Sequence, residues 1–451
     1  MTANKMLFLK KSGLLAIGLT AIFTRSSGQQ KINADSIKNK LTWFADAKLG
    51  IFIHWGIYAV NGIDESWSFY NKKISYPDYM KQLSGFTAAK YNPEAWAALI
   101  NESGAKYAVM TTKHHDGVAL WPTKQNQLNV VDRSPAKRDL VAPFFKALDK
   151  YGIKKGAYYS LLDWSNPDYP GFKKDSSGYK IADAAQRWQR FIQFDEAQID
   201  ELNKNYRPDL WWFDGDWEHT ADEWHATELR KRILNINPHA IINGRLMGFG
   251  DYDTPEQNFP VTRPNYNWWE LCLTINNNWG YQPQDTAWKT PYEIINIFTD
   301  VISNGGNLLL DIGPMQDGTI PDPEVHVLKE LGQWTKKHDK AIYGTLGGMP
   351  PGHFYGASTL SKDSTTLYLF VPAKTSSSIV IKGLSNKIEH IGIMGTSKTV
   401  QPKIVGKISW SPIPGLVYIN IPQEAQDKYM TVLAIQLDKP LKLYRGAGGL
   451  K

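Results

Sequence analysis

Short apolar segments alternate with longer amphipathic segments from Lys48 to about residue 340. We expect the apolar segments to be β-strands, and the clearest lie in KLGIFIHW, KYAVMTTKHH, KKGAYYSLLDW, DLWWFDG, AIINGR and NLLLDIG. The intervening segments have helix signals: Pro93 stands in the first turn of one, Gly104 follows its last turn, and Thr290 is a suitable N-cap for another. Strands and helices in this order predict parallel βα units.

The number of these units favours an α/β fold of the (β/α)8-like TIM barrel type, over residues 35–343. Six strands are clear, and there is room for two more, near Leu271 to Ile275 and after Lys340. A doubly wound open sheet is the alternative that the same alternation allows.

The pattern changes after Gly344. Short β-type segments follow one another with polar, glycine or proline turns between them and no convincing helix: TTLYLFVPA, SIVIKGL, EHIGIMG, GLVYINI and MTVLAIQL. This spacing predicts an antiparallel β-sandwich over residues 344–451. Sixteen of the 17 tryptophans precede residue 340, so we expect the aromatic chemistry in the first domain.

The first 28 residues have a basic start, an apolar run from Leu14 to Phe23 and small residues before Gln29. They predict a secretory signal peptide, and therefore export to the periplasm or the extracellular space. A membrane anchor is the less favoured alternative, because the run is shorter than the ~20 residues that span a bilayer. We expect no membrane attachment in the mature form and, with Cys272 as the only cysteine, no internal disulfide.

The charge of the chain does not indicate a nucleic-acid partner. The formal net charge is +7, but the first 28 residues contain four basic and no acidic residues, which leaves only +3 for the rest. No phosphate-binding glycine loop or dinucleotide fingerprint opens a helix, so we expect no cofactor. The glycine-rich NGGNLLLDIG precedes a strand instead.

Polar residues gather where the predicted strands end. In a barrel of this type the active site lies at the carboxyl ends of the strands, so these residues belong together. In chain order they are His54 and Trp55, then His114, His115 and Asp116, then Tyr158, Tyr159 and Asp163, then Asp214 and Asp216, then Asn243 and Arg245, with Glu256 and Glu270 beyond.

The segment DLWWFDGDWE combines carboxylates with tryptophans. Side chains alternate along a strand, so Trp212 and Asp214 share one face while Trp211 and Phe213 share the other. If Asp214 faces the barrel mouth, Trp212 lies beneath it and the other two pack against helices. A helix N-cap or a turn aspartate is the structural alternative for Asp214.

Two carboxyl groups and a rim of aromatic rings are the requirements of glycosidic bond hydrolysis. A metal site that includes the adjacent residues His114 and His115 is an alternative. Adjacent histidines on a regular strand project to opposite faces, so they bind one ion only if the strand ends or bulges between them. No cysteine or HExxH pattern joins them. We therefore expect no metal, and favour a sugar-binding pair over an ordinary packed one.

Six ordered motifs carry a family resemblance: FADAKLGIFIHWGIYAV, AKYAVMTTKHHDGVALWPT, GAYYSLLDW, PDLWWFDGDW, NWWELCLTINNNWGYQ and NGGNLLLDIGPMQDGTI. Over residues 43–340 the chain resembles glycoside hydrolase family twenty-nine, the retaining α-L-fucosidases. The resemblance implies a (β/α)8-like barrel followed by a β-sandwich, no cofactor, and a fucosylated oligosaccharide or glycoconjugate as substrate. It implies exo-acting release of terminal α-L-fucose by double displacement.

The resemblance also assigns site residues. Asp214 in WWFDG matches the nucleophile. The substrate-binding positions are Trp212, beneath the nucleophile, and those that the resemblance implies: His54, Glu65, Trp67, His114, His115, Tyr159, Arg245, Glu270 and Trp279. Of the two adjacent tyrosines, Tyr159 is preferred over Tyr158. Family members often show adjacent Glu and Trp after the first strand, whereas here Ser66 separates Glu65 from Trp67.

The acid/base catalyst has two candidates. Glu256 lies 42 residues after Asp214 on a polar segment, from which it could reach over the site. Glu270 has aromatic and apolar neighbours that could raise its pKa, but that equally fit a buried glutamate at the floor of the site. We favour Glu256, and interpret Asp216 and Glu218 as loop or helix-start carboxylates. A non-catalytic carbohydrate-binding protein and a metal-dependent hydrolase on the same barrel are the alternative functions.

Overall fold

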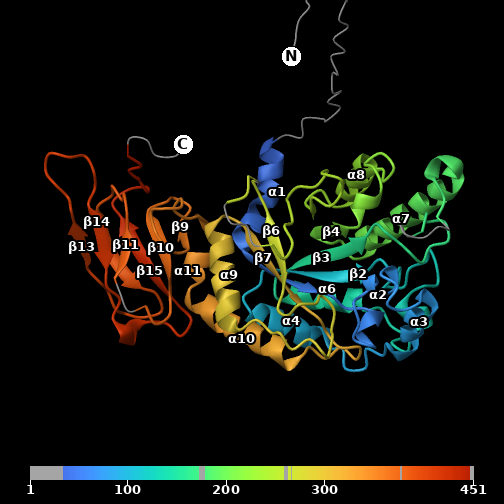
Figure 1. Ribbon diagram of the computed structural model, residues 1–451. Helices are drawn as coiled ribbons and strands as arrows, with labels where there is room; N and C mark the ends of the chain where they lie inside the picture. Colours follow the sequence, from blue (N-terminus) through green and yellow to red (C-terminus); the bar gives the residue numbers. More distant parts are fainter. Residues whose placement is uncertain (1–33, 172–177, 259–262, 266, 376–377, 447–451) are drawn as a thin grey trace, which may run out of the picture.

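The computed structural model describes residues 34–171, 178–258, 263–265, 267–375 and 378–446 (Figure 1). The predicted signal peptide, residues 1–28, lies outside the described residues. Within them, no helix has both the length and the apolar character needed to cross a membrane.

Seven parallel strands form the central sheet, in the order β5-β4-β3-β2-β1-β7-β6. They are β1 (Leu49–Ile53), β2 (Tyr107–Lys113), β3 (Lys154–Ser160), β4 (Leu210–Asp214), β5 (Ile241–Ile242), β6 (Glu270–Thr274) and β7 (Asn307–Ile312). Every neighbouring pair is parallel. The six clear strands and the seventh expected near residue 271 are confirmed, and the sheet is consistent with a (β/α)8-like barrel.

An irregular segment, residues 252–257, lies between the two edge strands of this sheet. Its Tyr252 forms a parallel bridge with Asn243 just after β5, and its Glu256 forms one with Cys272 of β6. The expectation of a barrel strand after Lys340 was wrong: β8 (Leu346–Gly347) pairs antiparallel with β9 (Ser358–Leu360) in the C-terminal part. Residues 252–257 escape sequence patterns because they are polar and include Pro255, which cannot donate to a ladder.

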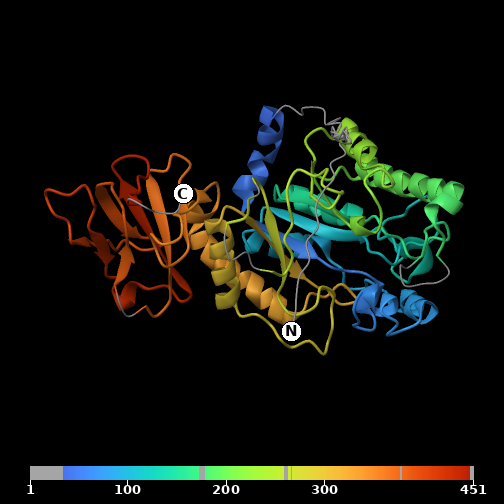
Figure 2. The ribbon, with the colours of Figure 1, turned by 45° about the horizontal axis from the view of Figure 1, so that its top comes forward.

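Helices follow the strands and cover the outside of the sheet (Figure 1, Figure 2). The long ones are α1 (Ala34–Ala47), α4 (Pro93–Glu102), α6 (Val141–Lys150), α7 (Ala185–Asn205), α8 (Ala226–Ile236), α9 (Pro291–Ser303) and α10 (Asp322–Lys337). The short ones are α2 (Trp67–Tyr70), α3 (Tyr76–Met80), α5 (Val130–Arg133) and α11 (Asp339–Ile342), with 3-10 turns at η1 (Ile57–Ala59), η2 (Lys81–Gly85), η3 (Ile181–Asp183), η4 (Asp216–Glu218) and η5 (Gln423–Ala425). The expected N-cap is confirmed, since Thr290 forms a capping box with Glu293.

The two faces of the parallel sheet belong to different apolar clusters. Trp212 packs in an inner cluster with Phe52 and Tyr158, inside the ring of strands. Trp211 and Phe213 belong to the larger cluster that includes the covering helices. The alternation predicted along DLWWFDG is therefore confirmed, and it directs Asp214 toward the inner face.

The C-terminal part consists of antiparallel strands in two sheets, with the orders β12-β15-β10-β9-β8 and β11-β14-β13. The remaining bounds are β10 (Thr366–Pro372), β11 (Ile379–Ile381), β12 (Ile388–Ile393), β13 (Pro402–Val405), β14 (Leu416–Ile419) and β15 (Met430–Leu437). Both sheets contribute side chains to one buried cluster. In both views α9 lies between these sheets and the parallel sheet (Figure 1, Figure 2), and Trp334 of α10 donates to the carbonyl of Met430 at 2.9 Å across the junction.

Candidate active site

Asp214, the last residue of β4, is held by two donors at the carboxyl end of the sheet. Tyr158 of the neighbouring strand β3 donates its hydroxyl hydrogen to Asp214 Oδ2 at 2.9 Å, and Arg245 Nη1 donates to Oδ1 at 2.9 Å. Burial opposes the charged form, but the positive charge of Arg245 and these hydrogen bonds outweigh it, so the pKa of Asp214 lies below its ordinary value. Asp214 is therefore a fixed carboxylate.

Arg245 joins Asp214 to a second carboxylate. Its Nη2 donates to Glu256 Oε2 at 2.6 Å, while its guanidinium lies 4.5 Å above the ring of Trp212. The Glu256 side chain is 39% exposed, against 12% for Asp214. One guanidinium thus holds a buried and a half-exposed carboxylate side by side. The structure therefore brings together Asp214, Arg245 and Glu256, which are far apart in the sequence.

Three buried histidines lie at the neighbouring strand ends. His54 Nδ1 lies 2.7 Å from Asp311 Oδ1, and His114 Nδ1 lies 2.5 Å from Ser66 Oγ. Burial lowers the pKa of His54 to about 3 and that of His115 to about 4, and it also lowers the pKa of His114. All three are neutral imidazoles near neutral pH.

The tautomer of His115 follows from its surroundings. Ser160 donates its hydroxyl hydrogen to the carbonyl of Leu162 at 2.6 Å, so its oxygen accepts from His115 Nδ1 at 2.5 Å. In the neutral ring Nε2 is then an acceptor, and it lies 3.6 Å from Asp214 Oδ2. His115 therefore presents an acceptor next to the carboxylate.

Both histidines of the HHD motif lie beside the site because strand β2 ends before them. The register of β2 against β3 shifts between Thr111 and Lys113, and the strand ends at Lys113. The rings of His114 and His115 are 4.4 Å apart, and Asp116, next in the motif, accepts from Tyr79 at 2.6 Å instead. Among the residues that the structure describes, no group of three or more His, Cys, Asp or Glu side chains is arranged to hold a metal ion.

Tyr159 lies outside the candidate site, so the preference for it over Tyr158 was wrong. Its hydroxyl donates to Asp195 of α7 at 2.6 Å and accepts from Lys113 at 2.8 Å, on the helix side of the sheet. Tyr158 occupies the inner face, because β3 pairs with β4 so that Tyr158 is the neighbour of Trp212. The alternation along β3 admits only one of two consecutive tyrosines to the site.

Glu270 forms part of the barrel interior and was wrongly placed among the substrate-binding residues. It is fully buried at the start of β6, and its two oxygens accept from Trp212 Nε1 at 2.8 Å and from the Tyr107 hydroxyl at 2.6 Å. Burial raises its pKa to about 7. Glu270 therefore supports the indole of Trp212, against which Arg245 packs. This is the alternative role of Glu270, a buried glutamate at the floor of the site.

Glu65 and Trp67 act on different sides of the histidines. Glu65 is buried and accepts from the backbone N–H of Gly280 at 2.6 Å, so it anchors the loop that carries Trp279. The Trp279 ring lies 4.9 Å from that of His54. The Trp67 ring lies 5.5 Å from that of His115. The two tryptophans thus flank the histidines, although Glu65 serves the site through backbone rather than at its surface.

Sequence reasoning missed several residues of this arrangement. Trp217, in the turn η4 after β4, is 46% exposed and stacks at 6.3 Å on Trp67. Its proximity to Asp214 in DLWWFDGDWE was the available signal. No local signal indicated Asp311, Ser66 and Ser160, the partners of the histidines, because each contact joins segments that only the fold brings together.

Comparison with known proteins identifies the family. A profile of the family "Alpha-L-fucosidase" matches residues 20–340, more than two thirds of the chain. The chain belongs to the α-L-fucosidase family. The resemblance to glycoside hydrolase family twenty-nine is thereby confirmed, and the protein is a glycoside hydrolase.

Related α-L-fucosidases extend the match to nearly the whole chain. The tissue α-L-fucosidase of Macaca fascicularis is 31% identical over 452 residues, covering 91% of this chain and 92% of that protein. α-L-Fucosidase isoenzyme 1 from Paenibacillus thiaminolyticus superposes with a TM-score of 0.80 at 31% identity, covering 90% of this chain and all of that one. A Bacteroides thetaiotaomicron α-L-fucosidase, solved as a trapped covalent intermediate with 2-fluoro-fucosyl fluoride, superposes with a TM-score of 0.77 at 26% identity, covering 88% and 96%.

Proposed function

We propose that this member of the α-L-fucosidase family is an exo-acting retaining α-L-fucosidase that releases terminal α-L-fucose from fucosylated glycans. The observation that carries the proposal is the pair of carboxylates on one guanidinium: Asp214 buried, charged and fixed, and Glu256 half-exposed. The trapped covalent intermediate of the related Bacteroides thetaiotaomicron enzyme supports a mechanism with a protein nucleophile.

In the first step an oxygen of Asp214 attacks the anomeric carbon of fucose, and the glycosidic C–O bond breaks with its electron pair passing to the leaving oxygen. Glu256 gives that oxygen its proton. In the second step Glu256 takes a proton from water, the water oxygen attacks the same carbon, and the bond to Asp214 breaks. Two displacements retain the configuration, and this route requires the two carboxyl groups to stand about 5–5.5 Å apart.

The neighbouring residues would bind the sugar. The neutral histidines His54, His114 and His115 offer hydrogen bonds to hydroxyl groups, and the Nε2 acceptor of His115 suits a hydroxyl donor. Trp279 and Trp67 would pack against the apolar faces of the sugar ring. A neutral ring beside Asp214 also avoids neutralising the nucleophile by proton transfer.

We further propose the finer organisation that the sequence favours. Residues 1–28 would be a signal peptide that exports the enzyme, residues 35–343 a complete (β/α)8-like catalytic barrel, and residues 344–451 a β-sandwich. A non-catalytic carbohydrate-binding role would need a missing catalytic group, and both candidate carboxylates are present.

The replacement Asp214→Gly tests the proposed function. We expect hydrolysis of an aryl α-L-fucoside to fall by on the order of 10⁴-fold or more, as for loss of other nucleophiles. Added azide should restore turnover and give a fucosyl azide of inverted configuration, because azide replaces the lost carboxylate in a single displacement. Asp216→Asn is the matched control, since Asp216 accepts from the Met247 backbone and lies two residues away. Undiminished hydrolysis by Asp214→Gly would remove Asp214 from the mechanism.

A further inference from the structure

Outside residues 1–28, the net positive charge of the chain lies in its C-terminal part. Residues 344–451 contain 12 lysines and arginines but only 5 aspartates and glutamates. Residues 29–343 contain 35 basic and 39 acidic residues. No acidic residue occurs between Glu389 and Glu424, a stretch that includes strands β13 and β14. The catalytic part is therefore slightly acidic, and the C-terminal part carries a net positive charge.

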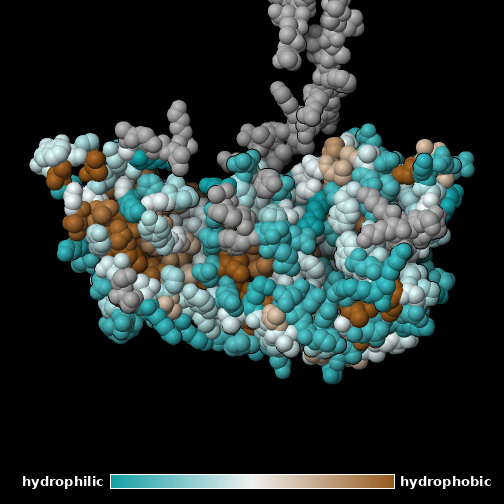
Figure 3. Space-filling view, in the orientation of Figure 1, coloured by the Kyte–Doolittle hydropathy of each residue, from teal (hydrophilic) through white to brown (hydrophobic). Residues whose placement is uncertain are grey.

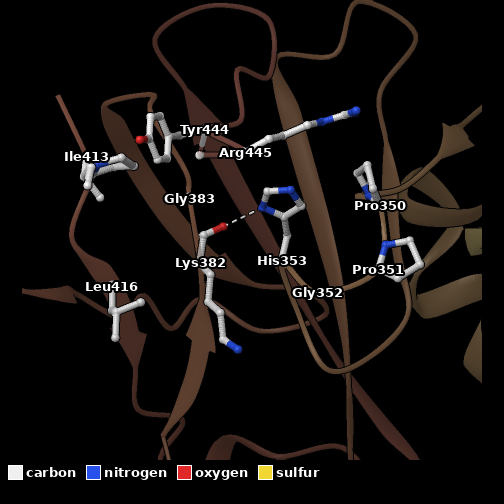
Figure 4. Close-up of a pocket in the computed structure, with 12 residues that line it drawn as sticks. Pro350, Pro351, Gly352, His353, Lys382, Gly383, Ile413, Leu416, Tyr444 and Arg445 are labelled. Atoms are coloured by element: carbon white, nitrogen blue, oxygen red, sulfur yellow. Dashed lines mark hydrogen bonds between the residues drawn. The ribbon is translucent and has the colours of Figure 1, made fainter. Parts of the chain in front are cut away.

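The C-terminal part contains a cavity of about 630 Å³, which is within the usual size range for a small-ligand site. Four separate segments form its walls: residues 350–353, residues 382–383 after β11, the approach to β14 and residues 444–446 (Figure 4). Among the residues that the structure describes, no aspartate or glutamate lines it.

The walls of the cavity combine cationic and apolar groups. Arg445 extends over His353 toward Pro350 (Figure 4), and in the part of the chain that the structure describes its guanidinium forms no ion pair. The His353 Nδ1–H donates to the Lys382 carbonyl at 2.7 Å, which leaves Nε2 for a ligand. Lys382 Nζ donates to the Tyr355 hydroxyl at 3.0 Å.

Exposed aromatic side chains stand on segments next to the cavity walls. Tyr355 is 80% exposed, and the Lys382 ammonium lies 4.5 Å above its ring. Trp410, in the loop that leads to Ile413 on the cavity wall, is 84% exposed. In the space-filling view, apolar residues gather over this end of the molecule, at the left (Figure 3). Exposed apolar groups concentrated in this way mark an interaction site.

The cavity is preformed by backbone hydrogen bonds between its walls. The N–H of Lys382 donates to the His353 carbonyl at 2.8 Å, and the N–H of Tyr444 donates to the Gly383 carbonyl at 2.7 Å. Gly383 has a φ of +72°, and a Cβ there would lie 2.5 Å from the Tyr444 carbonyl oxygen. Glycine is therefore required for this close approach.

We propose that this cavity is a second carbohydrate-binding site, which takes an acidic glycan: a sugar chain that carries carboxylate or sulfate groups. The Arg445 guanidinium would bind the anionic group, and the exposed aromatic rings would stack on sugar faces. A concave, preformed cavity suits one or two discrete residues of such a chain, whereas a bilayer or a nucleic-acid backbone would need a protruding or extended surface. The site is distinct from Asp214 and does not depend on the proposed reaction.

Chondroitin sulfate, which carries both kinds of anionic group, is the probe for calorimetric binding. We expect the full chain to bind it and not to bind neutral dextran. The double variant Lys382→Ala/Arg445→Ala should bind at least tenfold more weakly. The control Lys146→Ala/Lys336→Ala removes the same charge from exposed helix positions of the catalytic part and should bind within twofold of the wild type. Hydrolysis of an aryl α-L-fucoside, unchanged in both variants, would show that they are folded.

Three results would overturn the proposal. The first is absence of binding by the wild type. The second is an equal loss in the two double variants, which would indicate diffuse charge rather than a site. The third is equally tight binding of phosphatidylserine vesicles or duplex DNA, which would indicate a general polyanion surface. If the double variant does not fold, Arg445→Gln, a change at an exposed side chain, should still weaken binding at least threefold, and unchanged binding would overturn the proposal.

Discussion

Arg245 is the residue whose replacement most directly tests the electrostatics of the site. It is the largest favourable influence on the charged form of Asp214, which burial opposes. In Arg245→Gln the burial remains and the compensating charge is lost, so the pKa of Asp214 should rise. A hydrogen bond to a charged group contributes about 1.5–3 kcal/mol. Since 1.36 kcal/mol corresponds to one pKa unit, the acidic limb of kcat/KM should move to higher pH by about one unit or more.

The sign of this shift follows from the proposed role of Asp214 as the nucleophile. The nucleophile acts as the carboxylate, so activity falls as the pH drops through its pKa, and a higher pKa starts that fall at a higher pH. The assay is kcat/KM for an aryl α-L-fucoside between pH 4 and 8. Arg232→Gln is the matched control, because Arg232 is half-exposed and its ion pairs in the described structure are with Glu196 and Asp200. An acidic limb that stays in place in Arg245→Gln would refute the argument that Arg245 keeps Asp214 ionised.

Four further variants separate the proposed roles. Glu256→Ala should lose much activity on fucosides with poor leaving groups and little on activated aryl fucosides, and equal losses on both would count against the acid role. Tyr158→Phe should lower kcat/KM tenfold or more through the lost bond to Asp214, whereas Tyr159→Phe should mainly lower thermal stability; the reverse pattern would contradict the structure. Burial raises the pKa of Glu270 from 4.5 to about 7, so the wild type loses stability as the pH rises from 4.5 to 7, whereas Glu270→Gln does not. The stability of Glu270→Gln relative to the wild type should therefore increase over this range, and its activity should keep the leaving-group dependence of the wild type. A stability difference that does not change with pH would contradict the burial of Glu270 as a protonated acid.

The regular strands were predictable because strands that are buried on both faces consist of consecutive apolar residues. Strands β1 to β4 and β7 each coincide with such a run, and the alternation in DLWWFDG correctly assigned Trp212 to the inner face. The choice between Tyr158 and Tyr159 was not predictable in this way. Both are aromatic and buried, and the phase of β3 is set by its register with β4, where Ser160 pairs with Asp214. That register is a tertiary property.

The residues brought to the site by irregular backbone were only partly predictable. His114 and His115 both lie beside the candidate site because β2 shifts register and ends at Lys113. No local sequence pattern predicts this shift. The segment 252–257 has no apolar run, so a strand was sought after Lys340 instead. Glu256 was nevertheless found, because a chemical requirement for a second carboxylate pointed to it where periodicity did not.

The different backbone settings of the two carboxylates match their different proposed tasks. Asp214 ends a regular strand that is paired on both sides, is 12% exposed and has two donors, so it is held ionised in one position, as a nucleophile requires. Glu256 lies in a segment where Pro255 interrupts the ladder, and its side chain is 39% exposed. An acid/base must gain and lose a proton in each cycle and reach leaving groups of different shapes. The half-exposed Glu256 on its irregular segment is open to solvent and to leaving groups of different shapes, whereas the fully buried Glu270 is not.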